Sequence, residues 1–439
     1  MCRTHEQETD RPSPSIVILY PLSTILFFPI HHTFGPHVTF PYLLQSIKQL
    51  CLFWNWKNGK ERAWLRETLE HWFEARCSLF SSGREALLAL LRNLSIEQGS
   101  EIIVQGFTCI ALPNAIHAAG FTPVFTEIDP DTLNIDPVAL EGKITPRTKA
   151  IIVQHTFGIV AGMQKLREIA DRHGILLIED CAHVLPDTTG PARIGKHGDF
   201  LMLSFGRDKA ASGVSGGAII SKDSDIADAL QREEDSATEL SWCAIKRLLL
   251  YPCIYATTKP LYGIGIGKGL LMLASRFKAL APVITKKEKT GYQSTQLHRM
   301  PSALCALVRW EFKHFQKIND HRRMLSKKYK ASASNWKFPA GIDDHLPMQK
   351  FPLIVQDADG IRRKLKRKNI YLDDGWTGAS VCPRNVDQEA AGYISGSCPK
   401  AERLSQQILV LPTHPTMTKK QADRLIKILS ATMPRDGDS

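Results

Sequence analysis

Short apolar runs alternate with amphipathic stretches between residues 80 and 222, and this alternation predicts strands and helices in turn. Several runs are continuous in valine, isoleucine and leucine, which is typical of strands buried on both faces of a sheet. The pattern therefore predicts an α/β fold with a mainly parallel sheet covered by helices. Strands are predicted at 101–105, 123–128, 149–155, 175–179, 201–205 and 217–221, and helices at 85–91, 112–119 and 163–173.

The chain has 439 residues, and at ~150 residues per domain this length predicts two or three domains. We expect an N-terminal extension at 1–50, a large domain at 51–318 and a smaller C-terminal α/β domain at 319–439. Within the smaller domain, strands are predicted at 351–356, 370–372 and 408–411.

The N-terminal extension carries no Asp, Glu, Lys or Arg from Pro12 to Ile47. Its most apolar part, 16–30, is interrupted by proline and falls short of the ~20 apolar residues that span a bilayer. A wrongly assigned start codon or a peripheral extension accounts for it, with a membrane anchor as the alternative. The histidines there have no acidic or cysteine partner nearby, and we predict no metal site at them (His31, His32 and His37).

The net charge indicates which kinds of partner the protein binds, and the cysteines indicate the redox state of its compartment. Lys and Arg number 56 against 44 Asp and Glu, a net charge of +12, which favours anionic partners such as nucleotides or phospholipid. Nucleic-acid binding is not predicted, because no aromatic-interleaved basic patch or known module is present. The ten cysteines are scattered without a C-x-x-C pair, so we expect a reducing compartment and no structural zinc.

Ligands of parallel sheets bind beyond the carboxyl ends of the strands, and three chemical features fall there. Ser81-Ser82-Gly83-Arg84 opens a predicted helix, whose free N–H groups can bind an anion with help from Arg84. Asp180 follows the strand at 175–179, where a carboxylate can hold a protonated ring nitrogen. Lys209 follows the strand at 201–205, where a pocket-facing amine can form a Schiff base.

Each feature also has an ordinary explanation: a serine N-cap, a capping aspartate and a solvated lysine. Their combination is more specific. An anion cradle, a carboxylate and an amine are the groups that pyridoxal phosphate needs for its phosphate, its pyridinium nitrogen and its aldehyde. No metal is predicted at the neighbouring Cys181 and His183, because further ligands at a suitable spacing are missing.

Further motifs extend this set along the chain in a fixed order. They are SGREAL at 82–87, GFTC at 106–109, PNAI at 113–116, ITPRTKAI at 144–151, HTFG at 155–158, IEDCAH at 178–183, Ser204 with Lys209, CPKAE at 398–402 and LPT at 411–413. From about Trp54 to the C-terminus, this order strongly resembles the DegT/DnrJ/StrS family of pyridoxal-phosphate-dependent sugar aminotransferases.

The resemblance implies a fold-type-I transferase that forms a homodimer with active sites at the subunit interface. It implies that Lys209 is the Schiff-base lysine and Asp180 the partner of the pyridinium nitrogen. His183 matches a position near the cofactor's 3-oxygen. Ser204 and the turn Ser82-Gly83-Arg84 match phosphate contacts.

Two positions depart from the family pattern. Cys109 is the nearest match to an aromatic residue that stacks on the cofactor ring in many members, so stacking is lost or Phe107 supplies it. Gly291-Tyr292-Gln293 is the nearest match to a Gly-Tyr-Asn motif that reaches the partner subunit's phosphate. Arg84 stands where threonine is usual, and it can compensate for the altered motif.

The resemblance predicts a transaminase that moves an amino group from L-glutamate to a nucleotide-linked keto sugar, in cell-surface polysaccharide or amino-sugar biosynthesis. Two alternatives stay open. One is a non-catalytic, cofactor-binding regulator or membrane-associated scaffold, motivated by the departures. The other is a sugar dehydratase, although Lys209 occupies the position where related dehydratases carry histidine.

An insert at 240–288 contains eight Lys or Arg residues and no acidic residue before Glu288, together with many apolar residues. Such a segment suits an anionic membrane surface. The sequence predicts a cytoplasmic enzyme, and peripheral contact of this insert with the inner membrane is one hypothesis for its composition. Packing at a dimer interface or as a lid is the alternative.

Overall fold

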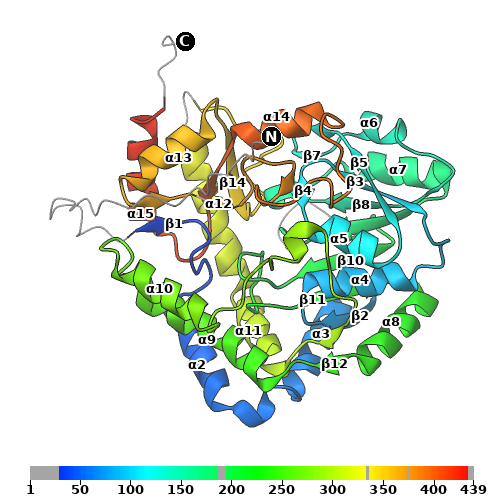
Figure 1. Cartoon of the computed structure of the whole chain (residues 1–439), viewed down its shortest axis with the longest axis horizontal. Coiled ribbons are helices and arrows are strands. Elements are labelled where there is room, and N and C mark those ends of the chain that lie inside the picture. The colour runs from blue at the N-terminus through cyan, green and yellow to red at the C-terminus, as the bar shows by residue number, and fades with distance from the viewer. Residues whose placement is uncertain (1–28, 186–193, 333–335, 373–374, 434–439) are drawn as a thin grey trace, which may run out of the picture.

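The computed structural model describes residues 29–185, 194–332, 336–372 and 375–433 (Figure 1). Its main sheet has nine strands. In sheet order these are β12 (Thr238–Glu239), β13 (His298–Arg299), β2 (Arg76–Phe80), β11 (Gly217–Ser221), β10 (Phe200–Ser204), β9 (Leu176–Asp180), β8 (Thr148–Gln154), β3 (Glu101–Gln105) and β5 (Thr122–Thr126). The six strands predicted between residues 101 and 221 all belong to this sheet.

The strand directions place several carboxyl ends at one edge of the sheet. β10, β9, β8, β3 and β5 are parallel, whereas β11 is antiparallel to both of its neighbours, β10 and β2. β2, which the sequence did not reveal, therefore runs in the same direction as β10. The mainly parallel α/β fold is confirmed, and the segments that follow β2, β9 and β10 meet at the same edge.

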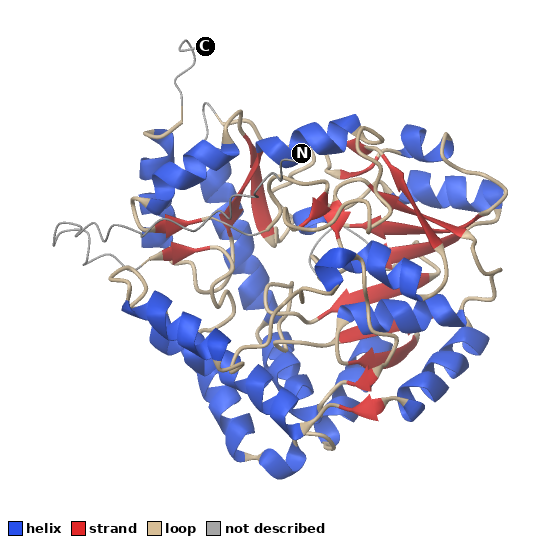
Figure 2. Cartoon of the chain, in the orientation of Figure 1, coloured by secondary structure: helices blue, strands red, loops and turns tan. Residues whose placement is uncertain are grey.

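Adjacent residues of one strand pack into different cores, which shows that the sheet is buried on both faces. On β3, Ile102 and Val104 join one core cluster, whereas Ile103 joins another. Figure 2 shows helices on both faces. One face is covered by α4 (Gly83–Asn93), α5 (Ala111–Ala118) and α8 (Ser224–Ser236), and the other by α3 (Lys60–Phe73), α7 (Met163–His173) and α11 (Ser302–Lys313).

The C-terminal part forms a smaller layer around an antiparallel pair, β14 (Lys350–Ile354) and β17 (Ile408–Pro412). A separate parallel pair, β16 (Val381–Cys382) and β4 (Thr108–Cys109), joins this part to the segment that follows β3. The predicted boundary at residue 319 falls within α12. The helices of this part are α12 (Phe315–Ala331), α13 (Ala358–Lys366), α14 (Pro399–Gln407) and α15 (Lys419–Ser430).

The described part of the N-terminal extension packs into the fold. β1 (Ile30–His31) pairs in parallel with β15 (Ile370–Tyr371) of the C-terminal part, and α2 (Phe40–Cys51) lies against the insert helix α9 (Trp242–Thr258). The remaining short elements are η1 (Phe53–Asn55), β6 (Ile128–Asp129), β7 (Asn134–Ile135), α6 (Pro137–Glu141), η2 (Thr156–Gly158), α10 (Ile266–Arg276) and η3 (Glu288–Thr290). The apolar residues 16–28 and the tail after Met433 lie outside the described residues.

Among the described residues, we find no helix with the length and apolar character needed to cross a membrane.

Candidate active site

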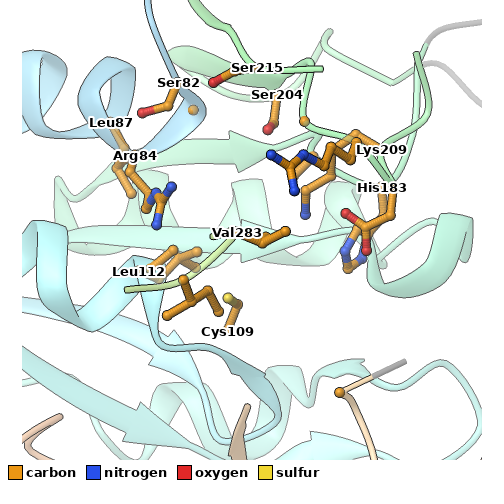
Figure 3. A pocket seen from close by; sticks show the side chains of 18 of the residues that line it. Ser82, Arg84, Leu87, Cys109, Leu112, His183, Ser204, Lys209, Ser215 and Val283 are labelled. Atoms are coloured by element: carbon orange, nitrogen blue, oxygen red, sulfur yellow. The ribbon is translucent and has the colours of Figure 1, made fainter. Parts of the chain in front are cut away.

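One cavity of about 220 Å³ opens at the carboxyl edge of the sheet, and all the predicted site residues line it (Figure 3). They come from four separate segments of the chain. These residues are Ser82, Gly83, Arg84, Cys109, Asp180, His183, Ser204 and Lys209. The sheet directions explain the convergence, because the turns after β2, β9 and β10 end at the same edge.

The predicted phosphate turn lies at one end of this cavity, where Figure 3 shows Ser82, Ser204 and Ser215 close together. The Ser82 hydroxyl caps α4 by accepting the Glu85 N–H at 3.3 Å. The remaining N–H groups of the first turn have no helical acceptor, and an anion can bind them. A Cβ on Gly83 would lie 2.9 Å from the Ser204 Oγ, so this approach of helix and strand requires glycine.

Arg84 lines the cavity, but its guanidinium already pairs with Glu288 at the end of the insert. Gln293, from the altered Gly-Tyr-Asn segment, donates to the Arg84 carbonyl oxygen at 3.2 Å. Glu288 and Gln293 therefore both hold Arg84 at the start of α4. An incoming phosphate would share Arg84 with Glu288.

Asp180 ends β9 and is buried at the floor of the cavity. Its Oδ1 accepts the Ala182 N–H at 2.9 Å. Burial raises the pKa of this carboxyl group above its ordinary value, against the opposing effect of the Lys209 ammonium. A cationic ring nitrogen placed against Asp180 would offset that burial, because an opposite charge stabilises a buried carboxylate.

His183 is buried beside the same floor and receives the Phe157 N–H at Nδ1, at 3.3 Å. Burial, with the nearby Lys209 and Lys350 ammonium groups, holds the pKa of His183 well below its usual range. The ring is therefore neutral. With Nδ1 accepting, its proton is on Nε2, which can donate to an oxygen in the cavity.

Two charged residues beside Lys209 were not predicted. Asp208 lines the cavity, and the Nζ of the fully buried Lys350 lies 3.5 Å from its Oδ2. Burial alone would raise the pKa of Asp208, but the charges of Lys350 and Lys209 outweigh it and hold that pKa below its ordinary value. The only sequence signal was a lysine opening the apolar strand β14.

Cys109 lines the cavity at the position where the family pattern has an aromatic residue. Burial raises the pKa of its thiol, so the side chain stays neutral. Phe107 is fully buried and packs against the Trp376 ring at 5.4 Å between centroids, so it does not supply the stacking surface. Trp376 lines the cavity instead, edge-on to His183 at 5.0 Å.

A buried group of metal-binding residue types, His155, Glu179 and Cys181, lies under this edge. Both Glu179 oxygens already accept hydrogen bonds, from His155 at 3.2 Å and from backbone N–H groups including Gly195 at 2.8 Å. Glu179 therefore anchors the loop at 194–198, and we infer no metal site.

The donor set fits pyridoxal phosphate. Hydroxyl groups and a helix N-terminus suit the phosphate, Asp180 suits the pyridinium nitrogen, His183 suits the ring oxygen and Lys209 suits the aldehyde. The same residues were predicted from the sequence, and the structure places them in one cavity.

Comparison with known sequences decides the family. The pattern of the DegT/DnrJ/EryC1/StrS aminotransferase family matches residues 44–241 and 274–430. The chain belongs to this family. The expectations of family, fold type, transaminase class and pyridoxal phosphate cofactor are thereby confirmed, and the regulator and dehydratase alternatives are not favoured.

Individual relatives share limited sequence identity with this chain. The chain is 39% identical to the L-glutamine:2-deoxy-scyllo-inosose aminotransferase of Streptomyces kanamyceticus over 163 residues, 37% of this chain and 38% of that protein. It is 26% identical to the UDP-N-acetyl-3-dehydro-alpha-D-glucosamine 3-aminotransferase of Acidithiobacillus ferrooxidans over 80% of this chain and 83% of that one. The solved NtdA of Bacillus subtilis with bound cofactor PMP has a TM-score of 0.68 at 20% identity, covering 96% of this chain and 86% of that one.

The N-terminal segment before residue 44 is outside the family match, yet it contacts the loop that carries Lys209. The His37 Nε2 lies 2.9 Å from the Lys209 carbonyl oxygen, and the Tyr42 hydroxyl donates to the Ser212 carbonyl at 3.0 Å. Between these, Arg322 donates to the Ala210 carbonyl at 2.8 Å. Sequence reasoning had no signal for these contacts, because they join segments more than 100 residues apart.

Proposed function

We propose that this family member transfers an amino group from an amino donor, L-glutamate or L-glutamine, to a nucleotide-linked keto sugar. The observation that carries the proposal is the convergence of Lys209, Asp180 and the Ser82–Arg84 turn in one cavity. The A. ferrooxidans relative, named for a UDP-linked sugar, supports a nucleotide-linked acceptor, and the S. kanamyceticus relative supports L-glutamine as an alternative donor.

When bound, pyridoxal phosphate supplies an aldehyde that condenses with amines and a ring that stabilises negative charge on the neighbouring carbon. Lys209 would hold the aldehyde, and its amine would move a proton at the reacting carbon of the substrate. Asp180 would keep the proton on the ring nitrogen. The neutral His183 would donate from Nε2 to the ring oxygen, and Trp376 and Cys109 would exclude water from the same cavity.

An absorbance spectrum tests the first half of the reaction. Protein loaded with pyridoxal phosphate is expected to show the visible band of the lysine-bound cofactor, and L-glutamate or L-glutamine is expected to bleach it. Lys209→Ala should lose both the band and turnover. Turnover retained by Lys209→Ala, or a band that neither donor bleaches, would refute the proposal.

We infer a homodimer in the cytoplasm as the working state. All nine cysteines of the described residues are free, which suits a reducing compartment. Light scattering of the purified protein should give a mass of twice 49.1 kDa. A monomeric mass with full activity would contradict the dimer.

We further propose that the insert contacts an anionic membrane surface. On α10 and at its C-cap, large apolar side chains are exposed, including Met272 at 72% and Phe277 at 75%, and Lys268 and Arg276 lie on the same helix. A groove of about 990 Å³ lies between α2, the end of α9 and α15. The described residues lining it include four cations and no carboxylate: Lys259, Lys420, Arg424 and Lys427. Burial lowers the pKa of Lys259 to about 8, so an anion there would be favoured.

Flotation with phosphatidylglycerol vesicles tests this contact. The double variant Met272→Ser/Phe277→Ser should lose binding, since both side chains are exposed and their loss leaves the core intact. Val138→Ser is the matched control, because Val138 is 83% exposed on α6, outside the insert. Equal flotation of wild type and double variant would refute the contact.

A further inference from the structure

Arg207 is a cation in the catalytic cavity that the proposed chemistry does not use. It lies two residues before Lys209 and lines the cavity with it. Its guanidinium carbon lies over the Tyr251 ring, 4.3 Å from the ring centroid. Within the described parts of the chain, Arg207 forms no ion pair, whereas the cavity's other arginine, Arg84, pairs with Glu288.

Tyr251 fixes the guanidinium from a segment outside the family match. It is 3% exposed and belongs to α9, within residues 242–273, which the family pattern leaves out. Leu248, on the same helix, lines the cavity. A ring stacked on the guanidinium face holds its plane and leaves its N–H edge open for a bidentate acceptor.

An arginine in a partly enclosed cavity is stabilised when an anion completes its hydrogen bonds. The cofactor phosphate has its own cradle at Ser82, Ser204 and the start of α4. The remaining anions in the proposed reaction belong to the two substrates. They are the carboxylates of the amino donor and the diphosphate of the nucleotide-linked sugar.

We propose that Arg207, held in place by Tyr251 of the insert helix α9, binds an anionic carboxylate or phosphate group of a substrate in the catalytic cavity. The inference rests on the proposed function for the identity of those substrates. It gives the insert a part in substrate selection, because α9 supplies both a wall of the cavity and the ring that orients Arg207.

Calorimetric titration of the cofactor-loaded enzyme tests the proposal with two unreactive probes. Glutarate represents the donor's carboxylates, and UDP represents the diphosphate. Arg207→Gln should weaken one of the two by about 10- to 100-fold, the effect of losing charge-assisted hydrogen bonds, and the weakened probe identifies the source. Tyr251→Leu should weaken the same probe by about two- to fivefold, whereas Tyr251→Phe, which keeps the ring, should bind as wild type does.

Three results would overturn the proposal: wild-type affinity of Arg207→Gln for both probes, no binding of either probe by the wild type, or a loss of cofactor affinity in Arg207→Gln. The last would assign Arg207 to the cofactor phosphate. Failure of the proposed function gives a different result. In that case neither donor bleaches the cofactor band of the wild-type enzyme, but Arg207-dependent binding of a probe can still be observed. Conversely, normal bleaching with unchanged probe affinity in Arg207→Gln removes this inference alone.

Discussion

The close approach of β11 to the start of α4 makes Gly217 a sharp test of the phosphate cradle. A Cβ at Gly217 would lie 2.5 Å from the Gly83 Cα, 2.6 Å from the Gly83 nitrogen and 2.7 Å from the Ser82 carbonyl carbon. Gly217 cannot retreat, because β11 is paired there with Ser204 on one side and Phe80 on the other. In Gly217→Ala the helix start must therefore move by roughly 1 Å to restore ordinary contacts.

Such overpacking against backbone costs about 1–3 kcal/mol of unfolding free energy. The same movement would displace the N–H groups at the start of α4 that we assign to the phosphate. Losing one charge-assisted hydrogen bond weakens the cofactor by about 10- to 100-fold. Denaturant unfolding and an absorbance titration with pyridoxal phosphate measure the two effects separately.

Gly269 gives a matched control on α10, since an added Cβ there meets nothing within 4 Å. Gly269→Ala should leave cofactor affinity unchanged and raise the unfolding free energy by up to about 1 kcal/mol, as helix propensity predicts. Cofactor affinity in Gly217→Ala equal to that of the wild type would refute the assignment of this turn to the phosphate.

Three further predictions concern polar side chains. His37→Ala should cost about 3–5 kcal/mol of unfolding free energy, because it leaves the buried Glu311, 2.7 Å from the His37 Nδ1, without its partner; the double variant with Glu311→Gln should recover part of this, and no recovery would count against the pair. Asp180→Asn should keep the visible cofactor band but lower turnover by about a hundredfold or more, and wild-type turnover would refute its role. The Glu85 hydrogen bond raises the pKa of His298 above its usual 6.5, so its contribution to stability is complete below pH 6.5 and is lost as pH rises through the raised value; the deficit of His298→Gln in denaturant unfolding should therefore shrink on going from acid to alkaline pH, and a constant deficit would contradict this.

Local signals identified the central strands because burial on both faces leaves an uninterrupted apolar run. The predicted bounds of β3, β11 and α7 match the observed ones, the last because Gly174 adopts a left-handed conformation after the helix. β2 escaped notice because its run, RCSLF, is short and opens with arginine. Phe107 could not be excluded as the stacking residue from sequence, because its direction is fixed by pairing of β4 with the distant β16.

The cavity residues that were found and those that were missed differ in how their positions are determined. Ser82, Asp180, Ser204 and Lys209 lie at the ends of strands in a parallel sheet, so the strand pattern brings them together. Trp376 lines the cavity and Lys350 lies beside Asp208 because distant segments dock there, which periodicity and spacing do not encode. Arg207 lies in the loop after β10, but the ring that orients it, Tyr251, comes from a distant helix.

Two segments outside the family match contact the loop that carries Arg207 and Lys209. One precedes this loop in the sequence and the other follows it. The N-terminal segment before residue 44 holds the backbone of the lysine loop through His37 and Tyr42. The insert helix α9 holds its Arg207 side chain through Tyr251. α2 and α9 also pack on each other, and the Ser46 hydroxyl donates to the Leu249 carbonyl at 2.7 Å. Because the two segments pack together against this loop, a change in either should alter the positions of Lys209 and Arg207 in the cavity. Ser82 and Asp180 should stay in place. Differences among family members in these two segments would therefore change substrate preference without changing the chemistry at the lysine.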